Sequence, residues 1–168
     1  FKGPKRTLMD KGKYTELFFL DEVTALSAGH RPCYECRRQA ANSFSDAWQS
    51  AHAMDARLTA ADMNKTLHSE RKTWRAKRIH QYVWKDLPDG AMVRVSSPDA
   101  PDAPDAEERY LAKHNGKAIL WTIHGYQGLS NRETIPPDQL CDVLTPPSII
   151  ASLHAGYQPQ WHSSAAAL

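Results

Sequence analysis

The sequence has 168 residues, of which 41% are hydrophobic and 24% are charged, and this composition is typical of one folded domain of ordinary size. No apolar run approaches the roughly 20 residues that cross a bilayer, so we expect no membrane partner. Three cysteines, an odd number, argue against a disulfide framework and indicate a reducing, cytoplasmic setting. The formal net charge is only +2, so the distribution of the charges along the chain is more informative than their sum.

The first predicted elements are a short strand and a short helix. Residues 14–20 form an aromatic and aliphatic run of strand length. Asp21 follows as the N-cap of a helix, Gly29 suits the left-handed position that ends it, and Pro32 prevents its continuation. The same Ala-Gly-x-x-Pro ending recurs within residues 152–159 without cysteines, so the glycine and the proline serve to end a helix and carry no chemistry.

Two longer helices are predicted next. Apolar residues recur at three- and four-residue steps over residues 33–52, which predicts a helix there. A further helical region begins near Thr59, where Asp62 three residues on matches the N-terminal capping pattern. We expect it to extend to about residue 85, which makes the first half of the chain rich in helix.

The second half is predicted to be rich in strands. A turn at 87–90 precedes a strand over 91–95, and residues 108–123 have the pattern of a hairpin with an Asn-Gly turn. The Pro-Asp-Ala repeat at 98–106 is too rich in proline to join a sheet and is predicted to be an exposed, acidic loop. A short helix is expected after 146–148. Helices first and strands second predict an α+β fold.

The residues with the clearest chemical potential are Cys33 and Cys36. Two cysteines at this spacing can direct both thiolates at one soft ion such as zinc. The charges of Arg31, Arg37 and Arg38 and the start of the following helix are expected to lower the thiol pKa values. Two alternatives remain open at this point: a pair of ordinary thiols, and a redox-active pair.

Strand, short helix ending in Ala-Gly, and Arg-Pro-Cys-x-x-Cys-Arg occur in this order within residues 17–38, and together they resemble the second half of the Ada-type metal-binding domain. Members of that family bind zinc through four cysteines and engage DNA, and in Ada itself one zinc-bound cysteine accepts a methyl group. The resemblance covers roughly residues 14–50 and implies a zinc site that includes Cys33 and Cys36. No cysteine precedes Cys33, so the first cysteine pair of the family is missing and methyl transfer is not expected.

His30 and His68 are candidates for further zinc ligands. His30 occupies an aromatic position of the family, which favours packing or capping. His68 and Glu70 form a His-x-Glu that, with Pro-Cys-x-x-Cys, is similar to the zinc deaminases, where the glutamate moves the proton. In that family the two motifs occur in the opposite order. A zinc-dependent enzyme acting on a nucleobase or nucleic acid, with Glu70 as its catalytic residue, is therefore an alternative.

A basic segment follows these motifs. Residues 65–85 carry seven lysines and arginines and a single acid, Glu70. Arg71, Arg75 and Arg78 are spaced to share one helix face, which suits contact with phosphates. A solvated helix face is the plain alternative. The tryptophans, Trp74 included, are expected to be core residues rather than platforms for stacking bases.

We expect a single compact domain with three regions: an Ada-like metal-knuckle region at 1–58, a basic helical segment at 59–85 and a β-rich region at 86–168. The leading hypothesis is a zinc-binding protein that binds nucleic acid, DNA above all, without catalysis. The alternatives are the zinc-dependent enzyme and a metal-free structural or interaction protein. The arginines assigned to nucleic acid are Arg31, Arg37, Arg38, Arg71, Arg75 and Arg78.

Overall fold

The computed structural model describes residues 17–53, 55–96, 108–130 and 134–168. The loop predicted at 98–106 and the first part of the strand predicted at 14–20 lie outside the described residues. In chain order the described elements are α1 Glu22–Ser27, α2 Arg38–Ala51, α3 Ala60–Arg71, β1 His80–Val83, the 3-10 turn η1 Trp84–Asp86, β2 Met92–Ser96, β3 Glu108–His114, β4 Lys117–Thr122, β5 Gly125–Gly128, β6 Leu140–Val143, α4 Pro147–His154 and the 3-10 turn η2 Ser163–Ala167.

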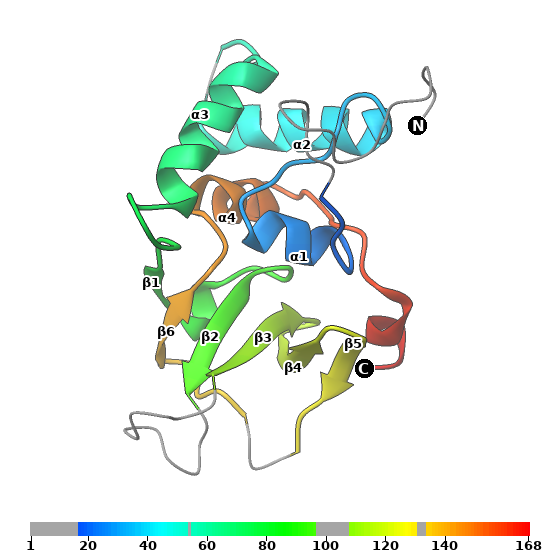
Figure 1. The fold of residues 1–168 in the computed structure, drawn as a ribbon, viewed down its shortest axis with the longest axis vertical. Coiled ribbons are helices and arrows are strands. Elements are labelled where there is room, and N and C mark those ends of the chain that lie inside the picture. The colour runs from blue at the N-terminus through cyan, green and yellow to red at the C-terminus, as the bar shows by residue number, and fades with distance from the viewer. Residues whose placement is uncertain (1–16, 54, 97–107, 131–133) are drawn as a thin grey trace.

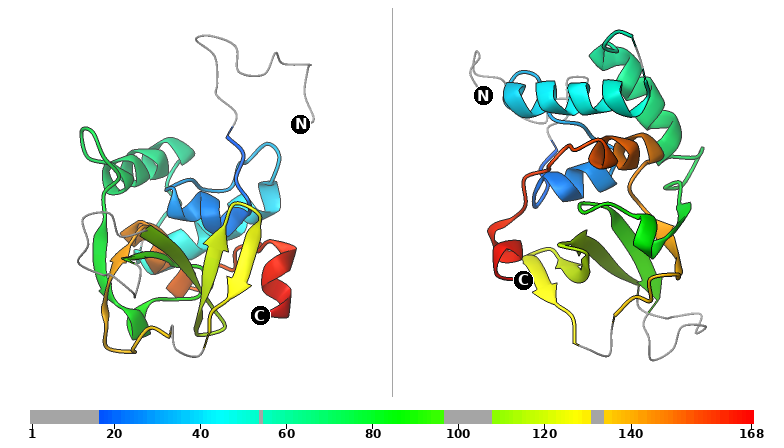
Figure 2. Two further views of the ribbon diagram at one scale, coloured as in Figure 1. Left: turned by 60° about the horizontal axis from the view of Figure 1, so that its bottom comes forward. Right: turned by 180° about the vertical axis from the view of Figure 1, so that it is seen from behind.

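The strands form one antiparallel sheet with the order β1-β6-β2-β3-β4-β5. The helices α1 and α4 lie next to the sheet, and α2 and α3 lie beyond them on the side away from the sheet (Figure 1). The view from behind shows the same layers, with η2 beside β5 (Figure 2). The predicted α+β fold is therefore confirmed, and α4 returns from the strand-rich half to complete the helical layers.

The ends of α1 and α4 have the predicted geometry. Asp21 accepts a hydrogen bond from the backbone N–H of Thr24 at 2.9 Å, as an N-cap does. Gly29 and Gly156 have φ angles of +77° and +98°, which side chains disfavour. The amide after each glycine donates to the carbonyl oxygen five residues earlier, at 2.9 Å in α1 and 3.1 Å in α4. Both helices thus end in the same hydrogen-bonded glycine turn, and the repeated pattern in the sequence is confirmed as a helix ending.

Three predicted boundaries were wrong. Residues 17–20 form no strand. The second helix begins at Arg38 and not at residue 33, because a separate turn comes first, closed by a hydrogen bond from the N–H of Arg37 to the oxygen of Cys33 at 2.9 Å. The third helix begins after Thr59 as predicted, but it ends at Arg71 rather than near residue 85.

The chain reverses direction after α3. Thr73 donates its backbone N–H to the carbonyl oxygen of Ala76 at 2.8 Å, and a bridge pairs Lys72 with Lys77. A strand, β1, then replaces the expected helix and pairs with β6. Consequently Arg75 lies in a loop, and the helix face that it was predicted to share with Arg71 and Arg78 does not exist.

The predicted hairpin and turn are confirmed. Strands β3 and β4 are joined at Asn115 and Gly116, which both have positive φ, +49° and +74°. This is the conformation that a two-residue Asn-Gly turn favours. The turn at 87–90 places Gly90 at a φ of +90° before β2.

Among the described residues, buried side chains gather in three clusters. One lies among the helices, and two involve the sheet: one with Val23 of α1 and one with Ile150 of α4. The sequence predicts that Trp121, Tyr126, Tyr157 and Trp161 form the core of the β-rich half. Tyr126 belongs to the sheet cluster with Val23, and the partly buried Trp121 and Trp161 pack against it. The prediction was wrong for Tyr157, which packs in the helical cluster. It was also wrong for Trp74, whose surface is 86% exposed. The helical cluster comprises Leu26, Phe44, Ala47, Trp48, Met63, Leu67, Ile149, Leu153 and Tyr157.

Candidate functional site

The two cysteines of the predicted knuckle lie side by side in the turn before α2. Both are free thiols. Burial raises the pKa of Cys33, but hydrogen bonds from the backbone N–H groups of Cys36 and Glu35 and from the Cys36 thiol outweigh it, so the pKa of Cys33 is lowered. Burial and the hydrogen bond to Cys33 raise the pKa of Cys36. Hydrogen bonding to Cys33, and not the arginine charges that the sequence suggested, is therefore what favours a thiolate here.

The other proposed metal ligands do not join the cysteine pair. Among the residues that the structure describes, no group of three or more His, Cys, Asp or Glu side chains is placed to hold a metal ion. The ring of His30 lies 5.3 Å from that of Phe19 and its Nε2 lies 3.0 Å from Nη1 of Arg71. Burial, followed by the charges of Arg71 and Lys77, lowers the pKa of His30. The cysteines thus supply two soft donors, half of a closed zinc site.

Glu70 has a contact that the sequence did not reveal. Its two carboxylate oxygens accept hydrogen bonds from Ser148 at the start of α4, from the hydroxyl at 2.6 Å and from the backbone N–H at 3.1 Å. The carboxylate therefore caps the N-terminus of α4, where negative charge is favoured. His68 lies away from it, beside Trp74 in a separate hollow.

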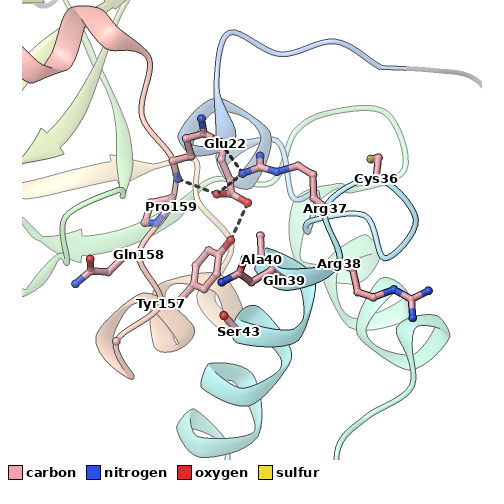
Figure 3. Close-up of a pocket in the computed structure, with 12 residues that line it drawn as sticks. Glu22, Cys36, Arg37, Arg38, Gln39, Ala40, Ser43, Tyr157, Gln158 and Pro159 are labelled. Atoms are coloured by element: carbon pink, nitrogen blue, oxygen red, sulfur yellow. Dashed lines mark hydrogen bonds and ion pairs between the residues drawn. The ribbon is translucent and has the colours of Figure 1, made fainter. Parts of the chain in front are cut away.

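A cleft of about 790 Å³ opens between the start of α2 and the segment after α4 (Figure 3). At its edge, the buried carboxylate of Glu22 accepts hydrogen bonds from the hydroxyl of Tyr157 at 2.7 Å and from the N–H of Gln160 at 2.8 Å. Arg37 lies 3.4 Å from the same carboxylate and donates to the Gln160 side chain at 2.9 Å. Residues that line the cleft include Cys36, Arg38, Ser43 and Gln158.

Three of the six candidate arginines are held by neighbours. Arg37 contacts Glu22, as described above. Arg31 donates to the side-chain oxygen of Asn64 on α3 at 3.0 Å, and Arg71 lies within 3.0 Å of His30. The contacts of Arg31 and Arg71 tie the segment before the cysteine turn and the end of α1 to α3. All three guanidinium groups are therefore already engaged in the folded chain.

The remaining candidates are exposed. The side chains of Arg38, Arg75 and Arg78 make no hydrogen bond or ion pair with another residue in the described ranges. Two of them belong to residues 72–78, which we call the basic loop, together with Lys72 and Trp74. A hollow of about 470 Å³ lies against this loop, lined by His68, Ser69, Lys72, Thr73, Trp74 and Arg78.

The sequence predicted Trp74 to be a core residue, so its exposure in the basic loop was missed. One signal was available: the indole stands within Lys-Thr-Trp-Arg-Ala-Lys-Arg, where no large apolar residue lies within three positions on either side. A tryptophan in such surroundings lacks local partners for burial.

Comparisons with family models, with curated proteins and with solved structures found no match to the chain. No helix in the described parts of the chain has the length and apolar character that crossing a membrane requires.

Proposed function

We propose that the protein binds nucleic acid without catalysing a reaction on it, and that the basic loop makes the main contact. The observation that supports this most directly is the exposure of Trp74, 86% of its surface, between cations that no described carboxylate neutralises. Lys72, Arg75 and Arg78 are exposed as well. Cations of this kind bind phosphates with loss of counterions, and an aromatic ring beside them packs on a sugar or base.

The proposal distinguishes among the six arginines. Arg75 and Arg78 make phosphate contacts together with Lys72, and Arg38 at the start of α2 is a further candidate. Arg31, Arg37 and Arg71 position the backbone through their internal contacts. The free thiols of the chain suit a reducing compartment, and a cytoplasmic location is part of this proposal.

The test compares two variants with the same change in charge. In the first, Lys72, Arg75 and Arg78 are each replaced by Gln; in the second, Arg57, Lys85 and Lys117 are. Affinity for a labelled oligonucleotide is measured at several salt concentrations between about 50 and 200 mM. Each lost phosphate contact should flatten the slope of log K against log salt by about 0.7 to 0.9. The first variant should therefore lose about two to three units of slope, and the second should lose little.

The proposed function fails on either of two results. One is a salt slope near zero for the unmodified protein. The other is an equal loss of affinity in both variants, because that outcome would assign binding to net charge rather than to the basic loop.

A second proposal concerns zinc. The pairing of Cys33 with Cys36, hydrogen-bonded in one turn, supports soft-metal binding by two thiolates, in keeping with the resemblance to the Ada-type domain. Two further donors are needed for a tetrahedral site, and the described residues do not provide them beside the pair. The proposed zinc site therefore takes two of its ligands from Cys33 and Cys36 and the remaining two from other groups.

Metal analysis of the purified protein tests this second proposal. We expect bound zinc that is lost when Cys33 and Cys36 are replaced by Ser and retained when Cys141, a buried thiol on β6, is replaced. A protein without zinc, whose melting temperature a chelator does not change, would refute it and would favour the metal-free alternative.

A further inference from the structure

The hollow beside the basic loop has a composition suited to a nucleobase. Its volume of about 470 Å³ lies within the range of about 300–1,000 Å³ typical of small-molecule sites. One wall is the exposed indole of Trp74, and Lys72 and Arg78 add positive charge. His68 and Ser69, on the last turns of α3, supply polar groups. An aromatic face with cations around it is the arrangement that binds bases of unpaired strands.

Hydrogen bonds hold the basic loop in shape. Thr73 donates its N–H to the oxygen of Ala76 at 2.8 Å, and its hydroxyl oxygen accepts the N–H of Ala76 at 3.2 Å. At the base of the loop the N–H of Arg78 donates to the oxygen of Arg71 at 3.0 Å. Trp74 therefore projects from a closed turn rather than from an unstructured segment, and presenting the indole in this way lowers the entropy that binding costs.

The exposure of Trp74 has an energetic meaning. Burial of an aromatic side chain stabilises a protein relative to its exposure to solvent, and the buried rings of Phe44 and Trp48 show that the core accommodates rings of this size. The fold leaves the indole of Trp74 in solvent, so its apolar surface is available to a ligand.

We infer that the hollow beside Trp74 receives an unpaired base, so that the protein binds single-stranded nucleic acid in preference to duplex. This inference rests on the proposed function. In a duplex the faces of the bases are covered by their stacked neighbours, and an indole at the surface reaches only the backbone. In a single strand a base can leave its neighbours and stack on Trp74, while Lys72 and Arg78 contact the flanking phosphates.

The experiment measures the affinity of the same labelled oligonucleotide of about 12 nucleotides, a length within single-strand site sizes, alone and annealed to its complement. We expect tighter binding of the single strand. Stacking of one base contributes about 1–3 kcal/mol, so Trp74→Ala should weaken single-strand binding by about 5- to 150-fold and leave duplex binding unchanged. Trp74→Phe should retain part of the affinity, because it retains a ring.

Ile123→Ala is the matched control, because Ile123 is another large exposed apolar side chain, 73% accessible, after β4. It should alter neither affinity. Circular dichroism confirms that each variant is folded, and quenching of the tryptophan fluorescence on addition of single strand should be smaller in Trp74→Phe than in the unmodified protein.

The outcomes separate the inference from the proposed function. Salt-dependent binding of both forms with equal affinity, unaffected by Trp74→Ala, would overturn the unpaired-base site and leave the proposed function standing. An equal loss for single strand and duplex in Trp74→Ala would also overturn it. No binding of either form would refute both.

Discussion

The hydroxyl of Tyr157 donates a hydrogen bond to the carboxylate of Glu22 at 2.7 Å, between residues 135 positions apart in the chain. Burial, followed by the hydrogen bond and charge of Glu22, raises the pKa of Tyr157, so the hydroxyl remains a protonated donor. The ring of Tyr157 also packs edge-on against Phe44 of α2, with 5.1 Å between ring centres. This one side chain therefore joins α1, α2 and the segment after α4.

Replacing Tyr157 by Phe should lower the free energy of unfolding by about 1–3 kcal/mol, because a buried charged acceptor loses a donor. Urea denaturation measures the loss. Tyr110→Phe is the matched control, since Tyr110 donates to Glu108 at 2.8 Å at the protein surface and water can replace that donor. Equal losses in the two variants would contradict a special role for the buried bond.

The two glycine turns should differ in their tolerance of alanine. A Cβ at Gly29 would approach side-chain atoms of Arg71 to 2.7 Å, whereas a Cβ at Gly156 would meet nothing within 4 Å. Both positions carry the cost of the left-handed conformation, about 1–2 kcal/mol. Gly29→Ala should therefore reduce the melting temperature more than Gly156→Ala, and the reverse order would show that Arg71 moves aside freely.

Glu70→Gln tests whether this carboxylate has a structural role. We expect a loss of about 1–2 kcal/mol in the free energy of unfolding, because the charged cap of α4 is weakened. Ser148→Ala should have a similar effect, and the double variant should lose less than the sum, as groups in direct contact do. A deaminating activity abolished by Glu70→Gln at unchanged stability would support the enzymatic alternative instead.

The stability of the protein should depend on Lys77 at alkaline pH. Burial and then the charge of Arg71 lower the pKa of Lys77 from 10.5 to about 8, while its Nζ donates to the oxygen of Ser27 at 2.6 Å. Between these two pH values the unfolded chain keeps a proton that the folded protein has released. The contribution of Lys77 to the free energy of unfolding therefore increases as the pH rises through this window.

Urea denaturation at several pH values from about 7 to 10.5 measures this dependence in the unmodified protein and in Lys77→Met. The difference in free energy of unfolding between the unmodified protein and Lys77→Met should change with pH. The change should be modest, because Lys77 is partly exposed. Lys85→Met, which removes a surface lysine paired with Asp138, should show the same pH dependence as the unmodified protein. A pH-independent difference for Lys77→Met would contradict the lowered pKa.

Local signals in the sequence predicted much of the fold. Asp21 as a cap, Gly29 as a helix end and the Asn-Gly turn of the hairpin act within a few residues, so neighbouring residues suffice to predict them. The helix after Thr59 was predicted at its start for the same reason. Its end was not, since no glycine or proline lies between Arg71 and Pro88, and the reversal depends on the pairing of β1 with a strand some 60 residues away.

Some features of the candidate sites could likewise be predicted from the sequence, and others depend on the tertiary structure. The sequence by itself determined that two cysteines stand three positions apart and that cations are concentrated between residues 65 and 85, because both are matters of spacing along the chain. Only the tertiary structure decided which of those groups are free. Long-range contacts engage Arg31, Arg37 and Arg71 and turn Glu70 into a helix cap. The reversal after α3 leaves Trp74 and its flanking cations in solvent, because the exposure of a side chain depends on what the rest of the chain packs against it.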